Sequence, residues 1–180
     1  KEFPELKIVF EHVSTQEAVE YILESKNNLA STITPQHLIF NRNDLLARGI
    51  RPHRYCAPIL KTEKDRLALV KAATSGDPRF FIGTDSAPDL IGEKESDCGC
   101  AGCYSAPHAI SLYLEVFEVE KKVEEFEKFT SLNGPKFYGS GVAFFPSTSC
   151  KSCSNHNPDS PFYLFCLSIH KSLFCTHTSS

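Results

Sequence analysis

Two side chains with metal-binding and acid–base chemistry each follow a short apolar run. His12 ends the stretch "LKIVFEH", and Asp85 ends the stretch "RFFIGTD". A carboxylate at the end of a buried strand costs desolvation free energy unless a cation or metal ion pairs with it. Taken singly, Asp85 also fits an Asx-turn or a helix N-cap, and His12 fits a structural histidine. Taken together, they form a ligand pair suited to zinc.

The elements that would carry these residues alternate between strand and helix patterns. Short apolar, β-branched and aromatic runs predict strands at residues 6–12, 29–35, 55–60 and 79–85. Pro58 restricts the third run to an edge position. Helical patterns cover residues 14–25, 63–76 and 106–129, the last with a break near Val119. This alternation predicts an α/β fold with mostly parallel strands, whose carboxyl ends gather the chemistry at one edge.

The last helical segment carries a regular apolar pattern. Its members are spaced by 4, 3, 4 and 3 residues: Leu112, Val116, Val119, Val123 and Phe126. That spacing predicts an amphipathic stripe facing the core of the same domain. A coiled-coil seam is the alternative interpretation.

Composition limits the class of protein. The chain has 180 residues, of which 41% are hydrophobic and 23% are charged, as in water-soluble globular domains. A net charge of −3 gives no electrostatic reason to expect nucleic acid or an anionic membrane as a partner. No apolar run approaches the roughly 20 residues that span a bilayer. With no secretory signal pattern, we expect a cytoplasmic protein, or an organellar one if a leader was removed, with its eight cysteines reduced.

The cysteines offer a rival metal site. Two C-x-x-C pairs, at Cys100 and Cys103 and at Cys150 and Cys153, are 46 residues apart, far beyond the compact ribbon spacing of ~15–20 residues. A non-enzymatic zinc module built on these four and Cys98 is therefore kept as an alternative function.

Six motifs, in order along the chain, carry a family resemblance. "FEHVST", "TITPQHLIFNRN", "RPHRYCAPILK", "GTDSAP", "KESDCGCAGCYSAP" and "NGPKFYG" resemble the carboxyl-terminal half of dihydroorotase, of the shorter bacterial and plant type within the amidohydrolase superfamily. The resemblance covers about residues 6–139. It implies part of a TIM-type (β/α)8 barrel and a metal-dependent hydrolase of pyrimidine biosynthesis, commonly a homodimer.

The resemblance also implies roles for individual residues. His12 would be a ligand of one zinc ion, and Asp85 would bind a second zinc ion and act as general base. In the family, a metal-held hydroxide attacks the ring amide of L-dihydroorotate, and the carboxylate passes its proton to the leaving nitrogen. Ala57 and Ala101 would hold the substrate through backbone groups. Where the family has a substrate-binding histidine, this chain has Asp89, which would repel an anionic substrate.

Several family features precede the first residue of this sequence. They include a His-x-His pair, the bridging lysine, another zinc-binding histidine, and the Arg and Asn that grip the substrate. We therefore expect residues 1–139 to form a partial barrel that binds zinc weakly and is inactive alone. A second alternative is that this half-barrel docks on a chain that supplies the missing strands.

Residues 140–180 differ from the rest of the chain. Only three of these 41 residues are charged, compared with 38 of the preceding 139, and ten are serine. Such a segment has little charge for solubility and no clear element pattern. We predict that it is an unrelated tail, disordered or mistranslated.

Overall fold

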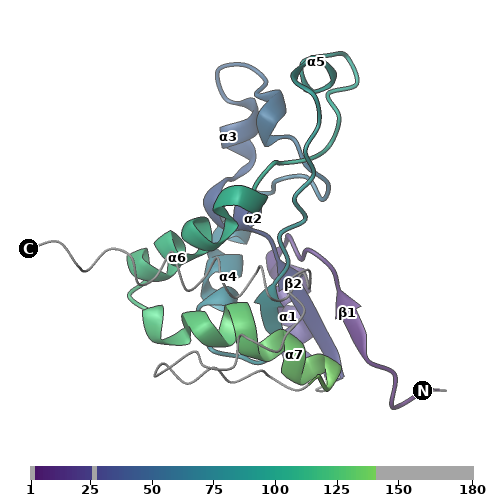
Figure 1. Cartoon of the computed structure of the whole chain (residues 1–180), viewed down its shortest axis with the longest axis vertical. Coiled ribbons are helices and arrows are strands. Elements are labelled where there is room, and N and C mark those ends of the chain that lie inside the picture. Colours follow the sequence, from purple (N-terminus) through teal and green to yellow (C-terminus); the bar gives the residue numbers. More distant parts are fainter. Residues whose placement is uncertain (1–2, 26–27, 141–180) are drawn as a thin grey trace, which may run out of the picture. The chain divides into compact units, whose positions relative to one another are not determined.

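The computed structural model describes residues 3–25 and 28–140. Its centre is a parallel sheet with the strand order β1-β2-β3, formed by Ile8–Phe10, Leu29–Ile33 and Phe80–Ile82 (Figure 1). Phe10 aligns with Ser31 of β2, and Ser31 aligns with Phe80 of β3. The chain thus returns to the start of each parallel strand through helices, which confirms the predicted α/β class. The complete or partial barrel stays a prediction.

The helices have the following bounds. They are α1 (Gln16–Glu24), α2 (Pro35–Ile39), α3 (Arg42–Leu46), α4 (Glu63–Ala73), α5 (Ile91–Lys94), α6 (Ala109–Val119) and α7 (Asn133–Tyr138). Short 3₁₀ turns lie at Pro52–Arg54, Ala106–His108 and Val123–Glu125, and a π-helical turn at Lys128–Leu132 leads into α7.

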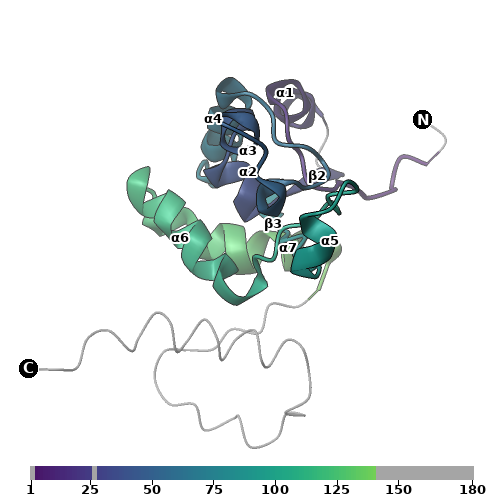
Figure 2. The same cartoon turned by 90° about the horizontal axis from the view of Figure 1, so that it is seen from above.

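The two faces of the sheet are packed by different helices. On one face, Leu29, Ile33 and Phe80 join a large core with side chains of α1, α4 and α6. On the other face, Ala30 and Phe81 pack against Phe137 of α7. Figure 2 shows α1 and α4 on one side of the strands and α7 on the other. Because both faces of β2 are covered, all five of its residues are buried, as is usual for a parallel strand.

Polar side chains cap the N-termini of α1 and α4. Thr15 caps α1, accepting the N–H of Ala18 at 3.1 Å. Thr62 and Asp65 form a capping box at the start of α4, and the Asp65 carboxylate also accepts the N–H of Gln16 at 3.0 Å. One carboxylate therefore joins the beginnings of two neighbouring helices.

One strand prediction was wrong. Residues 55–60 form no strand; they are a loop with a cis peptide between Ala57 and Pro58. Proline has no N–H for a sheet ladder, which explains why this apolar run stays outside the sheet.

The predicted apolar stripe was partly wrong: Phe126 is buried in the core and Val116 packs against it, but two other members do not face it. Val119 and Val123 are 73% and 49% exposed, and α6 instead buries Ala109, Tyr113 and Phe117. The helix ends at Val119, as expected, and Lys121 then takes a positive φ of 56°. Spacing counted across that break does not follow one helix face.

No helix among residues 3–25 and 28–140 is long and apolar enough to cross a membrane. The tail predicted at residues 140–180 lies outside the described residues except for Ser140, so that prediction is untested, and Cys150 and Cys153 lie outside them as well.

Candidate functional site

His12 and Asp85 lie close together just beyond the carboxyl ends of two strands. His12 follows β1 and Asp85 follows β3, and His12 Nε2 is 3.7 Å from Asp85 Oδ1. Their side chains are 22% and 35% exposed, so both retain access to solvent. The structure therefore brings together the two residues that the sequence singled out.

Both residues take a backbone conformation that is rare for residues with a side chain. The φ angle is 56° at His12 and 44° at Asp85. A non-glycine residue in the left-handed region costs of order 1–3 kcal/mol, and such residues concentrate at functional sites. The chain turns sharply at both strand ends, and these turns bring the two side chains together.

Thr32, on β2 between the two strands, orients the His12 ring. Its hydroxyl accepts the His12 backbone N–H at 2.8 Å and donates to Glu11 Oε2 at 2.8 Å. The hydroxyl also lies 3.1 Å from His12 Nδ1. Because its single hydrogen goes to Glu11, Nδ1 must donate to it, which leaves the lone pair of the neutral ring on Nε2. That nitrogen lies 3.7 Å from Asp85 Oδ1 and 3.6 Å from Glu11 Oε2. A ring that donates from one nitrogen and leaves the other free is the arrangement expected of a metal-binding histidine.

The pair fits part of a zinc site. An imidazole nitrogen and a carboxylate oxygen are both zinc ligands, and the 3.7 Å between Nε2 and Oδ1 places them in one metal centre. Two side chains do not complete the three protein ligands of a catalytic zinc site. Among residues 3–25 and 28–140, no group of three or more His, Cys, Asp or Glu side chains is placed to hold a metal ion.

His37 anchors the loop that carries Ala57. It is buried on α2, donates from Nε2 to the carbonyl oxygen of Pro58 at 2.8 Å, and accepts at Nδ1 from the Thr34 hydroxyl at 2.6 Å. Burial of the ring lowers the pKa of His37 to about 4, so the side chain is neutral near pH 7. Because the imidazole is neutral and both of its nitrogens are hydrogen-bonded, His37 holds the loop in place and is not available as a base.

The loops that carry Ala57 and Ala101 are bound to each other. Both alanines are exposed. The N–H of Gly102 donates to the Tyr55 carbonyl at 2.9 Å, and the buried Lys94 ammonium bonds to carbonyl groups of both loops. Ala57 and Ala101, the two predicted substrate-binding residues, therefore lie on loops that the same hydrogen bonds hold together.

Asp89 lies beside Gly102, in the loop that carries Ala101. Its side chain is exposed, and a Cβ placed on Gly102 would come within 2.9 Å of its Oδ2. The carboxylate therefore sits against the loop of Ala101, where the negative charge can act on a ligand of that loop.

The described cysteines do not form a thiolate metal site. Cys56, Cys98, Cys100 and Cys103 are free thiols. Cys103 is buried and donates to the His53 carbonyl at 3.6 Å, whereas Cys98 and Cys100 lie together with their sulfur atoms 4.0 Å apart. A hydrogen bond with Cys103, and then burial, raises the pKa of Cys56, which keeps that thiol protonated.

Sequence reasoning gave no role to Thr32, His37 or Lys94. Thr32 had a signal, because a polar residue inside the otherwise buried run "LASTI" needs a partner. His37 and Lys94 had none in periodicity or spacing, since each bonds a backbone carbonyl of a distant loop, at Pro58 and Tyr55 respectively.

Sequence comparison finds relatives named dihydroorotase. No family model matches the chain. Dihydroorotase from Microcystis aeruginosa is 60% identical over 136 residues, which make up 76% of this chain and 40% of that protein. Dihydroorotase from Cupriavidus metallidurans is 56% identical over 139 residues, or 77% of this chain and 40% of that protein. The chain thus spans about 40% of the length of these curated relatives.

Solved structures give the same result. Dihydroorotase from Saccharomyces cerevisiae, in complex with 5-fluoroorotic acid, has a TM-score of 0.73 and 36% identity, covering 78% of this chain and 40% of that one. A D-hydantoinase at 22% identity, with a TM-score of 0.62, shares the fold over 72% of this chain and 31% of its own.

Proposed function

We propose that the chain is a partial-length member of the dihydroorotase family and supplies half of a dihydroorotase active site, since it is 60% and 56% identical to two dihydroorotases over 40% of their length. The reaction is the hydrolysis of L-dihydroorotate to N-carbamoyl-L-aspartate, and its reversal in pyrimidine biosynthesis. The observation that carries the proposal is the 3.7 Å approach of His12 Nε2 to Asp85 Oδ1 at two neighbouring strand ends. We propose that the chain is inactive by itself, because two ligands bind zinc weakly.

His12 and Asp85 would have different roles in the reaction. His12 would hold a zinc ion through Nε2, and Asp85 would hold another through its carboxylate. Zinc, when bound, supplies Lewis acidity and lowers the pKa of water to ~7. Asp85 would accept the proton of the attacking water and deliver it to the ring nitrogen, as the C–N bond breaks and a C–O bond forms.

The supported loops would hold the substrate. Backbone groups of Ala57 and Ala101 are exposed on loops that Lys94 and the Gly102–Tyr55 hydrogen bond tie together. Rigid backbone donors suit an anionic substrate, since they add no rotamer entropy on binding. Asp89 would oppose this binding through its charge.

The rest of the active site would come from polypeptide outside this sequence. The chain spans 40% of its relatives, and the sheet has two edge strands among the described residues. A complete (β/α)8 barrel would join those edges through further strands. Homodimerisation, a cytoplasmic location and the lack of a nucleic acid partner belong to the same proposal; the four free thiols agree with a reducing compartment.

The test is complementation. The chain is co-expressed with the part of the Microcystis aeruginosa enzyme that lies outside the 136 matched residues, and dihydroorotate hydrolysis is followed in the purified mixture. We expect no turnover by either piece alone and measurable turnover by the pair. Asp85→Asn and His12→Gln should each lower kcat by at least about 100-fold.

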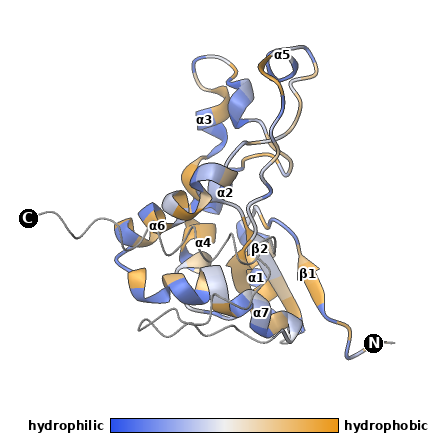
Figure 3. Ribbon diagram, viewed as in Figure 1, coloured by the Kyte–Doolittle hydropathy of each residue, from blue (hydrophilic) through white to orange (hydrophobic). Residues whose placement is uncertain are grey.

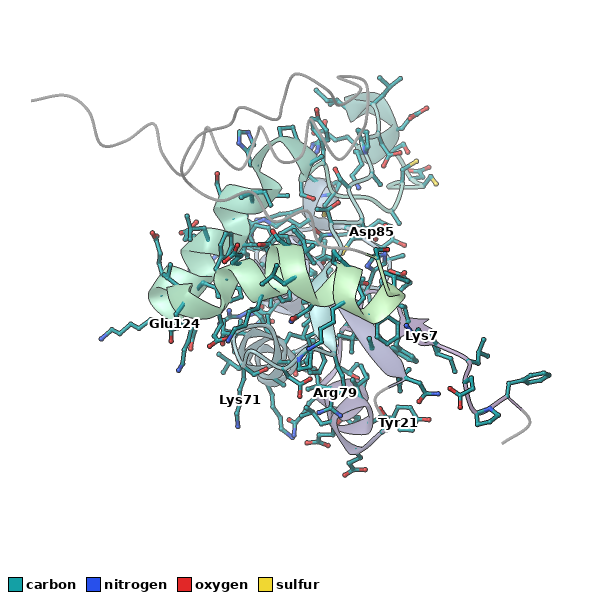
Figure 4. All side chains as sticks on the ribbon, turned by 60° about the horizontal axis from the view of Figure 1, so that its bottom comes forward. Lys7, Tyr21, Lys71, Arg79, Asp85 and Glu124 are labelled. Atoms are coloured by element: carbon teal, nitrogen blue, oxygen red, sulfur yellow. The ribbon has the colours of Figure 1, made fainter. Side chains whose placement is uncertain are left out.

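The matched control is Lys71→Met, which changes an exposed side chain on α4 that extends away from Asp85 (Figure 4). It should leave turnover unchanged. A pair that assembles and yet stays inactive, or an Asp85→Asn pair as active as wild type, would refute the proposal.

A further inference from the structure

Lys94 is a buried cation whose hydrogen bonds all go to backbone oxygens, and its Nζ also lies 5.8 Å from the centre of the Tyr55 ring. Only 3% of the residue is exposed, and its Nζ donates to the carbonyl groups of Tyr55 at 3.1 Å, Gly102 at 2.8 Å and Cys100. Within the described residues, no carboxylate forms an ion pair with it. Burying an ammonium is costly, and three carbonyl acceptors use all three of its donors.

The three carbonyl groups fix the direction of one peptide group in particular. Cys100 and Gly102 flank Ala101, and the Cys100 oxygen shares a planar trans peptide with the Ala101 N–H. In such a peptide the C=O and N–H bonds point in opposite directions. With its oxygen bound to Lys94, this peptide must present the Ala101 N–H on the side away from the ammonium. Among the described residues, that N–H has no acceptor.

The segment around Ala101 also lies next to the chain that follows Asp85. The Ala87 N–H donates to the Cys103 carbonyl at 3.0 Å, and Ser86 pairs with Cys103 in an isolated parallel bridge. The Ser86 hydroxyl accepts the N–H groups of Ser105 at 3.1 Å and Ala106 at 2.9 Å. The loop that Lys94 fixes is therefore attached to the exit of β3.

We propose that Lys94 is a positioning residue: its ammonium clamps the Tyr55 and Cys100–Gly102 loops so that the Ala101 N–H stays free to donate to an anionic oxygen of the substrate. An apolar side chain of similar length would fill the same space at a lower desolvation cost, but it would not direct these carbonyl groups. The substrate part of this inference rests on the proposed function, whereas the clamp does not.

The clamp is tested in the 180-residue chain by NMR. In the wild type, the ¹⁵N signal of the Lys94 ammonium should exchange slowly with solvent, because all three of its hydrogens are bonded. In Lys94→Met, the Gly102 amide should exchange at least about tenfold faster, because its bond to Tyr55 loses the adjacent clamp. The Ser31 amide, bonded to Arg79 in the sheet at 2.7 Å, should be unchanged, and Lys71→Met should leave all three signals as in wild type.

A rapidly exchanging Lys94 ammonium in the wild-type chain overturns the clamp, even if Lys94→Met fails to fold. Unchanged Gly102 exchange in a folded Lys94→Met chain overturns it as well.

The positioning role is tested in the complemented enzyme. Lys94→Met should raise KM for dihydroorotate at least about tenfold and leave kcat within about threefold, since Lys94 touches neither metal nor reacting atoms. A fall in kcat of at least about tenfold with an unchanged KM would overturn the positioning role. If the wild-type pair shows no turnover, the proposed function fails, and the NMR measurements still decide the clamp.

Discussion

At the scale of single residues, the buried His37 links pH to stability. Its folded-state pKa is about 4, below the ordinary value of 6.5, because burial disfavours the charged ring. Between those two values the unfolded chain binds a proton that the folded chain does not. The free energy of unfolding should therefore fall as pH falls from 6.5 to about 4, by roughly 3 kcal/mol in total. Urea unfolding at a series of pH values measures this loss.

His37→Gln separates this effect from the titration of the acidic residues. The variant removes the ionisable group and keeps a polar side chain at the same position of α2. Its free energy of unfolding should decline less steeply below pH 6.5 than that of wild type. Parallel curves for the two proteins would contradict the burial of a neutral His37.

Asp89 provides a second test at the residue scale. The carboxylate lies against Gly102, beside the loop of Ala101, and should repel an anionic substrate. Asp89→His, which restores the residue type of the family, should lower the KM of the complemented enzyme by about tenfold, equivalent to roughly 1.4 kcal/mol. A KM that is unchanged would show that Asp89 points away from the bound substrate.

Residue types and motif order were enough to select His12 and Asp85, because strand ends are readable from apolar runs. The sequence could not reveal that Thr32 sets the ring orientation of His12 or that Lys94 ties two loops together. Each depends on a hydrogen bond between residues 20 or more positions apart, from His12 to Thr32 and from Lys94 to Tyr55, and such pairings leave no local pattern.

At the scale of elements, the close contact of β2 with the turn after β3 fixes the distance between His12 and Asp85. A Cβ at Gly83 would lie 2.5 Å from Thr32 Cβ. Gly83→Ala should therefore push the two strand ends apart and cost about 1–3 kcal/mol of stability. Thermal unfolding by circular dichroism measures the change.

Gly92→Ala is the matched control for this substitution. Gly92 lies in α5, and a Cβ added to it would have no other atom within 4 Å, so the variant should be at least as stable as wild type. Equal melting temperatures for both variants would contradict the tight contact between Gly83 and Thr32.

The elements differ in how well sequence predicts them. Three of the four predicted strands are present, because short runs rich in apolar and β-branched residues mark strands. The fourth run failed at Pro58, and the helical stripe failed at Val119 and Val123 because α6 ends at Val119. Apolar spacing alone does not show where a helix ends, or which of two apolar faces of a helix packs against the core.

At the scale of the whole molecule, as far as the structure describes it, β1 forms an exposed apolar edge of the sheet. Its residues Ile8 and Phe10 are about half exposed, and Figure 3 shows the strand as hydrophobic. It borders a groove of about 400 Å³, lined by Ile8, Phe10, Tyr21, Ser25, Asn28 and Leu29. An apolar strand with an unpaired edge promotes association with another chain.

Phe10→Lys should therefore reduce self-association of the isolated chain, since a lysine on an edge strand opposes strand pairing. Static light scattering as a function of protein concentration measures the effect. Leu90→Lys, at an exposed apolar residue outside the sheet, is the control and should leave self-association unchanged. The same effect from both variants would assign the association to general hydrophobicity instead of the β1 edge.

The most direct test of the metal centre is the position of zinc in crystals of the chain soaked with zinc salt, located by anomalous scattering. The account predicts one zinc ion at bonding distance from His12 Nε2 and a second, neighbouring ion at bonding distance from an Asp85 carboxylate oxygen. Zinc bound only at cysteines, with no ion at His12 or Asp85, would contradict it.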